Sequence, residues 1–199
     1  KTNGRETVHR IYNNEFIFKN PHNGRVFDLQ GFGSTDNKGQ ILLYGNLFRD
    51  DAAMSGSLAR IFAPYCGSGT DGWTFKLFGN TFDVGRGVNE ICASSGYRLV
   101  ERNNAFFRST NVHAATAASV VRSNELCSNA NPSCTTPALS NRGDWFASGA
   151  LQGVHTGVAA YAPKLSGPLY RAGSCDPDGD GVAGVDYDGD GVNDLRWRD

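Results

Sequence analysis

The sequence lacks every motif that would identify an enzyme. Its four histidines, His9, His22, His113 and His155, are far apart, and neither H-E-x-x-H nor G-x-S-x-G occurs. Neighbouring acids such as Asp50 and Asp51 fall in polar, turn-like segments, which indicates solvated surface groups. We therefore expect no catalytic activity and assign no catalytic residue.

Long hydrophobic runs are also missing. None of the segments in the 199 residues reaches 18 consecutive apolar residues, so none suits a membrane-spanning helix. The chain is nevertheless 39% hydrophobic and 11% aromatic, which excludes a disordered protein. Its length suits one globular domain that does not insert into a membrane.

No concentrated basic patch occurs either. The arginines are scattered, and no basic run with interleaved aromatic residues predicts nucleic-acid binding. Eight aspartates and two arginines give the last 24 residues a formal charge of −6. Because the whole chain carries −1, residues 1–175 carry +5. Opposite charges on body and tail favour contacts between copies of the chain.

The cysteine pattern excludes some sites and favours export. No C-x-x-C motif occurs, so neither a zinc nor a thioredoxin-like site is expected. The chain begins at Lys1 rather than Met and shows no apolar signal segment, which predicts a processed, secreted product. The single N-x-S/T sequence is disqualified by Pro132, and the lack of a glycosylation acceptor favours a bacterial source.

Five cysteines in an exported chain predict disulfides. Cys127 and Cys134 flank a short polar loop that a disulfide would close easily. A second bridge is expected between Cys66 and Cys92, which leaves Cys175 unpaired or linked between chains. This pairing is a preference among the connectivities that five cysteines allow.

Most of the chain consists of short runs of aromatic and β-branched residues separated by turns rich in glycine and asparagine. The predicted strands are residues 15–19, 25–30, 40–44, 73–78, 81–84, 97–101 and 105–108. Helices are expected at 57–63 and 113–126, and a return to strand between 145 and 170. This spacing favours a β-sandwich or barrel, and we predict an immunoglobulin-like β-sandwich with one or two short helices.

The clearest motif lies near the C-terminus, where "DPDGDGV" at 176–182 recurs as "DYDGDGV" at 186–192. Carboxylates at positions 1, 3 and 5, a backbone carbonyl at 7 and glycine at 6 form a calcium loop. Without a cation, neighbouring carboxylates would repel one another by roughly 1 to 4 kcal/mol per pair. The predicted calcium ligands are Asp176, Asp178, Asp180, Val182, Asp186, Asp188, Asp190, Val192 and Asp194.

This stretch resembles the calcium loops of thrombospondin type 3 repeats and, less closely, those of dockerins and EF-hands. It departs from EF-hands at position 12, where Tyr187 and Trp197 replace the bidentate glutamate. The resemblance implies Ca²⁺ as the bound ion, modest affinity, and Asp186 shared between the two sites. Oxygen ligands of this kind suit calcium rather than zinc.

These features together predict a structural protein. The chain is similar to subunits of bacterial extracellular fibrils, especially donor-strand pili, in which an N-terminal strand completes the immunoglobulin-like sandwich of the neighbouring subunit. The resemblance implies three parts: an N-terminal extension at 1–19 containing the donated strand "TVHRIY", a β-sandwich body at 20–175, and a calcium-binding tail at 176–199. The predicted partner is the chain itself, as a homopolymer on the cell surface.

Two alternatives remain open. A secreted carbohydrate-binding module would explain the aromatic content, and "GRVFDLQG" at 24–31 resembles the opening of a ricin-type β-trefoil lectin repeat. The other alternative is a secreted hydrolase that uses calcium structurally. The carbohydrate-binding alternative also implies contacts with glycans or surfaces.

Overall fold

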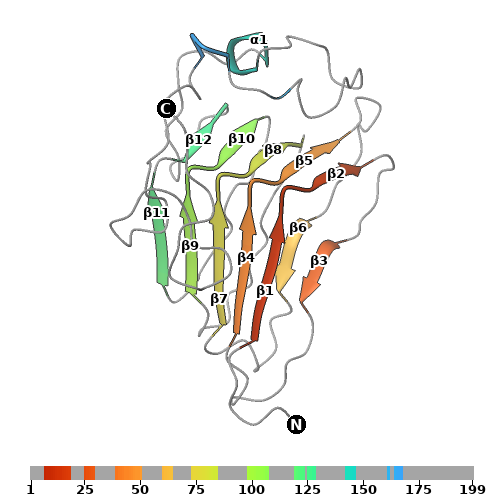
Figure 1. The fold of residues 1–199 in the computed structure, drawn as a ribbon, viewed down its shortest axis with the longest axis vertical. Coiled ribbons are helices and arrows are strands. Elements are labelled where there is room, and N and C mark those ends of the chain that lie inside the picture. Colours follow the sequence, from red (N-terminus) through yellow and green to blue (C-terminus); the bar gives the residue numbers. More distant parts are fainter. Residues whose placement is uncertain are drawn as a thin grey trace.

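The computed structural model describes residues 7–18, 25–29, 39–50, 60–64, 73–84, 98–107, 119–123, 125–128, 142–146, 161 and 164–167. These parts contain twelve strands and one short helix (Figure 1). The strands are β1 (Thr7–Tyr12), β2 (Glu15–Phe18), β3 (Arg25–Leu29), β4 (Gly39–Tyr44), β5 (Leu47–Asp50), β6 (Arg60–Pro64), β7 (Trp73–Phe78), β8 (Thr81–Asp83), β9 (Arg98–Arg102), β10 (Ala105–Phe107), β11 (Ser119–Ser123) and β12 (Leu126–Cys127), and the helix is α1 (Arg142–Trp145).

The strands form three sheets. Sheet A has the order β1-β4-β7-β9-β11, sheet B the order β12-β10-β8-β5-β2, and sheet C pairs β3 with β6. Every pairing among the described strands is parallel. The predicted immunoglobulin-like sandwich is therefore wrong, because that fold consists of antiparallel sheets.

Consecutive strands do not pair with each other. β1 leads into β2, but β1 pairs with β4 and β2 pairs with β5. Parallel strands usually need a long helical crossover, whereas here the chain turns from one sheet into the next and returns one strand further along. This path is a parallel β-helix, in which each turn of the chain, or coil, adds one strand to sheet A and one to sheet B (Figure 1).

Two-residue bends join sheet A to sheet B. The first residue of four of these bends is left-handed: φ is 53° at Asn13, 60° at Gly45, 59° at Gly79 and 59° at Asn103. In each of these four bends the chain leaves a strand of sheet A and enters a strand of sheet B, and the left-handed residue is part of this sharp change of direction.

Gly45 shows why small residues suit this bend. A Cβ atom at this position would lie 2.7 Å from Oδ1 of Asn13 in the preceding coil. Glycine therefore meets two local requirements, the left-handed backbone and the close approach of the neighbouring coil. Asparagine, which tolerates left-handed φ better than most residues, takes the same place at Asn13 and Asn103.

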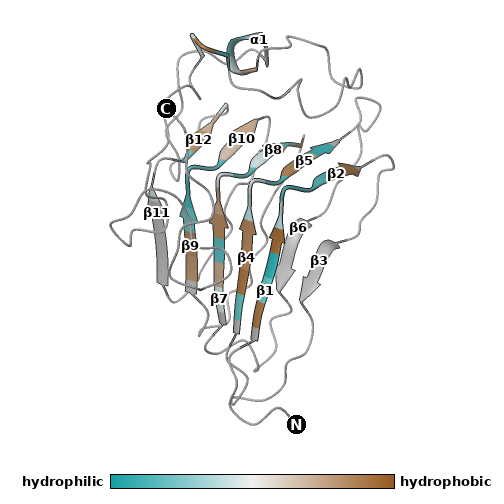
Figure 2. Cartoon of the chain, in the orientation of Figure 1, coloured by the Kyte–Doolittle hydropathy of each residue, from teal (hydrophilic) through white to brown (hydrophobic). Residues whose placement is uncertain are grey.

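Apolar side chains cover both faces of sheet A. On one face Leu43, Leu77 and Leu99 are almost fully buried, and Glu101, the register partner of Leu77, is 0% exposed. The other face carries the cluster formed by Leu42, Tyr44, Phe78 and Val100, with Val8 packed against it. Hydrophobic stretches occupy much of β4 and β7, whereas β1, at the end of the sheet, has a polar middle (Figure 2).

Sheet B is covered on its outer face by the α1 segment. Trp145 and Phe146 pack with Phe107 of β10, with ring centroids 5.6 and 5.7 Å apart in edge-to-face geometry. Tyr161 completes this cluster against Phe146 at 5.1 Å. The cluster also includes Leu47 of β5 and Ala105 of β10, and α1 lies at the same end of the molecule as sheet B (Figure 1).

All seven predicted strands coincide with observed ones, but both predicted helices are wrong where the structure describes them. Residues 60–64 form β6 and residues 119–123 form β11. β11 contains Val120 and Val121, whose β-branched side chains suit a strand, and its pairing with β9 outweighs the helix-favouring alanines before it. Trp145, expected in a strand, ends α1 instead. In the described part of the chain, no helix is long and apolar enough to cross a membrane.

Candidate functional site

A ladder of asparagine side chains runs through the bends and organises the solenoid. Asn14, Asn46, Asn80 and Asn104 follow the left-handed residues of successive coils, and Glu125 occupies the fifth position. Along the chain, successive members of this set are separated by 32, 34, 24 and 21 residues. We call this set the asparagine ladder.

The hydrogen bonds between successive side chains of the ladder all run in the same direction. The side-chain amide of Asn46 donates to Oδ1 of Asn80 at 3.0 Å, and the amide of Asn80 donates to Oδ1 of Asn104 at 2.9 Å. The backbone N–H of each donor residue reaches the same oxygen, at 3.1 and 2.9 Å. The donors therefore lie on the N-terminal side and the acceptors on the C-terminal side of every step.

Glu125 ends this sequence of donors and acceptors. Its Oε1 accepts from the side-chain amide of Asn104 at 3.1 Å and from its backbone N–H at 3.3 Å. A carboxylate has no N–H to donate, so it cannot repeat the interaction toward a further coil. Glu125 is 3% exposed, which places this end of the ladder in the protein interior.

Phenylalanine rings form a second continuous column two residues after the ladder. Phe16, Phe48, Phe82 and Phe106 stack with centroids 4.7, 4.8 and 4.9 Å apart and nearly parallel planes. These spacings match the distance between neighbouring strands in a sheet. Cys127 follows Phe106 in the register and is fully buried. We call these four rings the phenylalanine stack.

The first coil, residues 7–18, is the open end of the solenoid. β1 and β2 are the outermost strands of sheets A and B, so one hydrogen-bonding edge of each has no neighbour among the described strands. Tyr12 is 50% exposed, whereas Tyr44, which stacks on it at 4.9 Å, is 1% exposed. Ile17 is 40% exposed. We call residues 7–18 the N-terminal coil, and its place at the end of sheets A and B makes it the candidate functional site.

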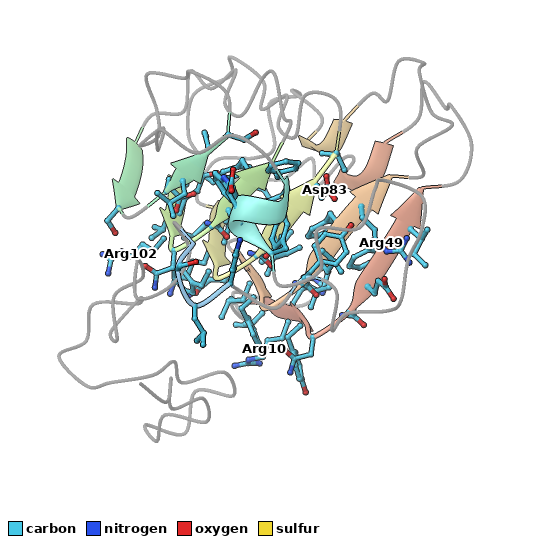
Figure 3. The ribbon with its side chains drawn as sticks, turned by 90° about the horizontal axis from the view of Figure 1, so that it is seen from above. Arg10, Arg49, Asp83 and Arg102 are labelled. Atoms are coloured by element: carbon cyan, nitrogen blue, oxygen red, sulfur yellow. The ribbon has the colours of Figure 1, made fainter. Side chains whose placement is uncertain are left out.

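Next to this coil lies a charged cluster on the outer face of sheet B. The Nε atom of Arg49 is 2.5 Å from Oε1 of Glu15, and the exposed fractions of the two side chains are 5% and 26%. Nη1 of Arg49 makes no hydrogen bond within the described residues. Arg49 is also the register partner of Asp83, and Figure 3 shows both on sheet B, apart from Arg10 and Arg102 of sheet A. Glu15 thus ties the N-terminal coil to the next one.

Asp83 anchors the covering segment to the sheet. Its Oδ2 accepts a hydrogen bond of 2.8 Å from the hydroxyl of Tyr161, and Asp83 is 1% exposed. A substrate could reach this carboxylate only if Tyr161 moved away. The contact therefore serves packing in this arrangement.

We expect Tyr161→Phe to lower the free energy of unfolding by about 1.5–3 kcal/mol, since a buried hydrogen bond to a carboxylate is lost without a change of shape. Guanidinium denaturation followed by circular dichroism measures this loss. Tyr12→Phe is the matched control, because Tyr12 is half exposed and its change should stay within about 0.5 kcal/mol. Equal effects of the two changes would contradict the anchoring role.

The structure tests little of the predicted calcium and disulfide chemistry. Residues 176–199, including all nine predicted ligands, lie outside the described residues. Within the described residues no group of three or more histidine, cysteine or acidic side chains could hold a metal ion. Cys127 is disulfide-bonded, and all other cysteines fall outside the described parts, so its pairing with Cys134 stays a prediction.

The asparagine ladder and phenylalanine stack were missed in the sequence, although a signal exists. The four-residue pattern "NNEF", "GNLF", "GNTF", "NNAF" occurs at 13, 45, 79 and 103, and "NELC" at 124 continues it. The sequence also contains a similarity between "GRVFDLQG" at 24–31 and "GNTFDVGRG" at 79–87, but it does not follow the coils, because it compares β3 with β8, which lie in different sheets. Comparisons of the chain with known protein families, curated proteins and solved structures found no match.

Proposed function

We propose that this chain is a structural subunit of an extracellular, fibril-like assembly of identical copies, held together by strand addition and stabilised by calcium. The observation that carries the proposal is the place of β1 and β2 at the ends of sheets A and B, where neither has an outer neighbour among the described strands. Strands at the end of a sheet are the elements to which another chain can add a strand.

The mode of strand addition differs from donor-strand exchange. β1, which contains "TVHRIY", already pairs with β4 of its own chain through all six residues. It therefore contributes its outer edge to a neighbour and does not leave its own sheet. The folded coil supplies a prepared edge, so little ordering is needed on association.

A fibril needs a second contact, and the acidic tail is our candidate for it. The tail carries −6 and residues 1–175 carry +5, so tail and body of different copies attract one another. Screening limits this attraction to about 8 Å at physiological salt, so it orients copies at contact and does not act over longer range. Bound calcium would give the tail a defined shape.

Electron microscopy of the purified protein with calcium tests the function. We expect helical fibrils that disperse when calcium is chelated. A protein that remains monomeric at the highest attainable concentration would contradict the proposal and favour the carbohydrate-binding alternative, for which glycan-array binding is the direct measurement.

Calcium binding is tested separately. We expect Asp178→Ala combined with Asp188→Ala to abolish calcium binding in titration calorimetry, because each change removes a central ligand of one loop. Acidification should weaken binding in the unchanged protein, since protons compete for the carboxylates. Asp199→Ala, outside both loops, is the control and should bind normally. Unchanged stoichiometry in the double variant would overturn the assignment.

A further inference from the structure

The outer face of sheet A carries positive charge and, among its described side chains, no negative charge. This is the face with the apolar cluster that includes Phe78 and Val100. Because successive residues of a strand alternate between the two faces, Lys76 of β7 and Arg102 of β9 lie on it as well. Glu101 is the only acid in the five strands of sheet A, and it alternates onto the opposite face.

Lys76 and Arg102 are diagonal neighbours on this face. Lys76 pairs in register with Val100, and Arg102 pairs with Phe78, so the two cations are one strand and two residues apart. The usual strand spacing and rise put their Cα atoms roughly 8 Å from each other. Figure 3 shows Arg102 away from Arg49 of sheet B. We call Lys76 and Arg102 the cation pair.

The described part of the chain does not neutralise the cation pair. Lys76 makes neither a hydrogen bond nor an ion pair among the described residues. Nε of Arg102 is buried there without a hydrogen-bond acceptor. A guanidinium N–H without an acceptor costs free energy, and two neighbouring cations repel each other. Both side chains are only partly buried, so an anionic group from outside can contact them and offset the repulsion.

Carboxylates match the chemistry of this pair. A guanidinium presents a planar fork of donors that fits a carboxylate, and an ammonium group adds a compact positive charge beside it. The chain itself contains a segment rich in carboxylates, the tail at 176–199, with a formal charge of −6. Two bound calcium ions would contribute +4, so the tail would keep a charge of −2 and still attract the cation pair.

The place where the tail starts favours contact with another copy. Gly167, the last described residue before the tail, packs so closely on the α1 segment that a Cβ atom would lie near the backbone oxygen of Asp144. That segment covers the outer face of sheet B, where Trp145 packs on Phe107. The tail therefore begins beside one sheet, whereas the cation pair lies on the outer face of the other.

We propose that Lys76 and Arg102 form the site on the body that binds carboxylates of the acidic tail, residues 176–199, of a second copy. The contact joins two different surfaces, so it is heterologous and can repeat without closing, as a fibril requires. This inference rests on the proposed function and names the body side of its tail contact.

Carbodiimide coupling of the full chain in the presence of calcium tests the contact. The reagent joins an amine to a carboxylate only where the two touch, so we expect an amide bond between Nζ of Lys76 and an aspartate of the tail, found by peptide mapping. Mixing copies labelled with ¹⁴N and ¹⁵N shows whether the linked peptides come from different copies. Lys164, an exposed lysine in the segment that covers sheet B, is the control and should give only background linkage between copies.

Sedimentation of Lys76→Gln and Arg102→Gln gives a second readout. We expect each change to weaken self-association about two- to fivefold and the two together roughly tenfold, which is the range for ion pairs at a surface. Circular dichroism verifies that the fold is intact. Lys164→Gln removes the same charge elsewhere and should leave the association unchanged.

The outcomes separate this inference from the proposed function. Small oligomers that show the Lys76 linkage between copies but form no fibrils would support the inference and contradict the fibril. Fibrils formed equally well by the double variant would overturn the inference and leave the fibril standing. Tail linkages confined to single copies, no linkage at Lys76, or an unchanged chain that stays monomeric would each overturn the inference.

Discussion

Replacing Asn80 by alanine is expected to lower the free energy of unfolding by about 4 kcal/mol. The side chain of Asn80 accepts two hydrogen bonds from Asn46, at 3.1 and 3.0 Å, and donates to Asn104 Oδ1 and to the backbone carbonyl of Leu43, both at 2.9 Å. Asn80 is 1% exposed, so water cannot replace these partners without entering the core. Alanine would leave several buried polar groups without hydrogen bonds at once.

Guanidinium denaturation of Asn80→Ala and Asn14→Ala provides the comparison. Asn14 makes the same kind of ladder contact, 3.2 Å to Asn46, but it lies at the exposed end. Water can satisfy the groups that it leaves, so we expect a loss below about 1.5 kcal/mol. If the two changes cost the same, the ladder does not contribute through its buried hydrogen bonds.

The second large effect is expected for Phe82→Ala, which should cost about 3–5 kcal/mol. Phe82 is 0% exposed and lies between Phe48 and Phe106, with ring centroids 4.8 and 4.9 Å away. Removing the ring leaves a cavity in the middle of the phenylalanine stack and breaks contacts with two aromatic neighbours. The backbone of sheet B cannot close this gap, because hydrogen bonds hold its strands at a set spacing.

Phe16→Ala is the matched control for this change. Phe16 ends the stack, touches only Phe48 at 4.7 Å within the stack, and is partly exposed. We expect less than half the loss found for Phe82→Ala in the monomeric protein, measured by thermal and guanidinium denaturation. A loss as large as that of Phe82→Ala would indicate that position within the stack is unimportant.

The middle coils and the N-terminal coil differ in how deeply their ladder and stack residues are buried. The middle coils hold the ladder and the stack in fully buried form, whereas the N-terminal coil repeats the same chemistry with exposed side chains. In the proposed assembly, this outermost described coil would supply the strands to which a second copy adds.

The sequence by itself determined where most strands lie. Alternating apolar and polar residues, as in "WTFKLF" of β7, specify a strand because successive side chains point to opposite faces. It also determined where the turns fall, from glycine and asparagine, and it contains the paired aspartate motifs that predict calcium binding. Each of these properties depends on residues close together in the chain.

Only the tertiary structure decided which strands pair. A strand pattern with a period of two residues is the same in parallel and antiparallel sheets, so "TVHRIY" does not reveal that its neighbour is β4. The repeat that would have revealed it is hidden, because successive ladder residues are separated by 32, 34, 24 and 21 positions. Asn80 is buried and Asn14 is exposed because Asn80 has described coils on both sides and Asn14 has one on a single side only. The number of neighbouring coils depends on residues far apart in the chain, so a short sequence pattern does not predict it.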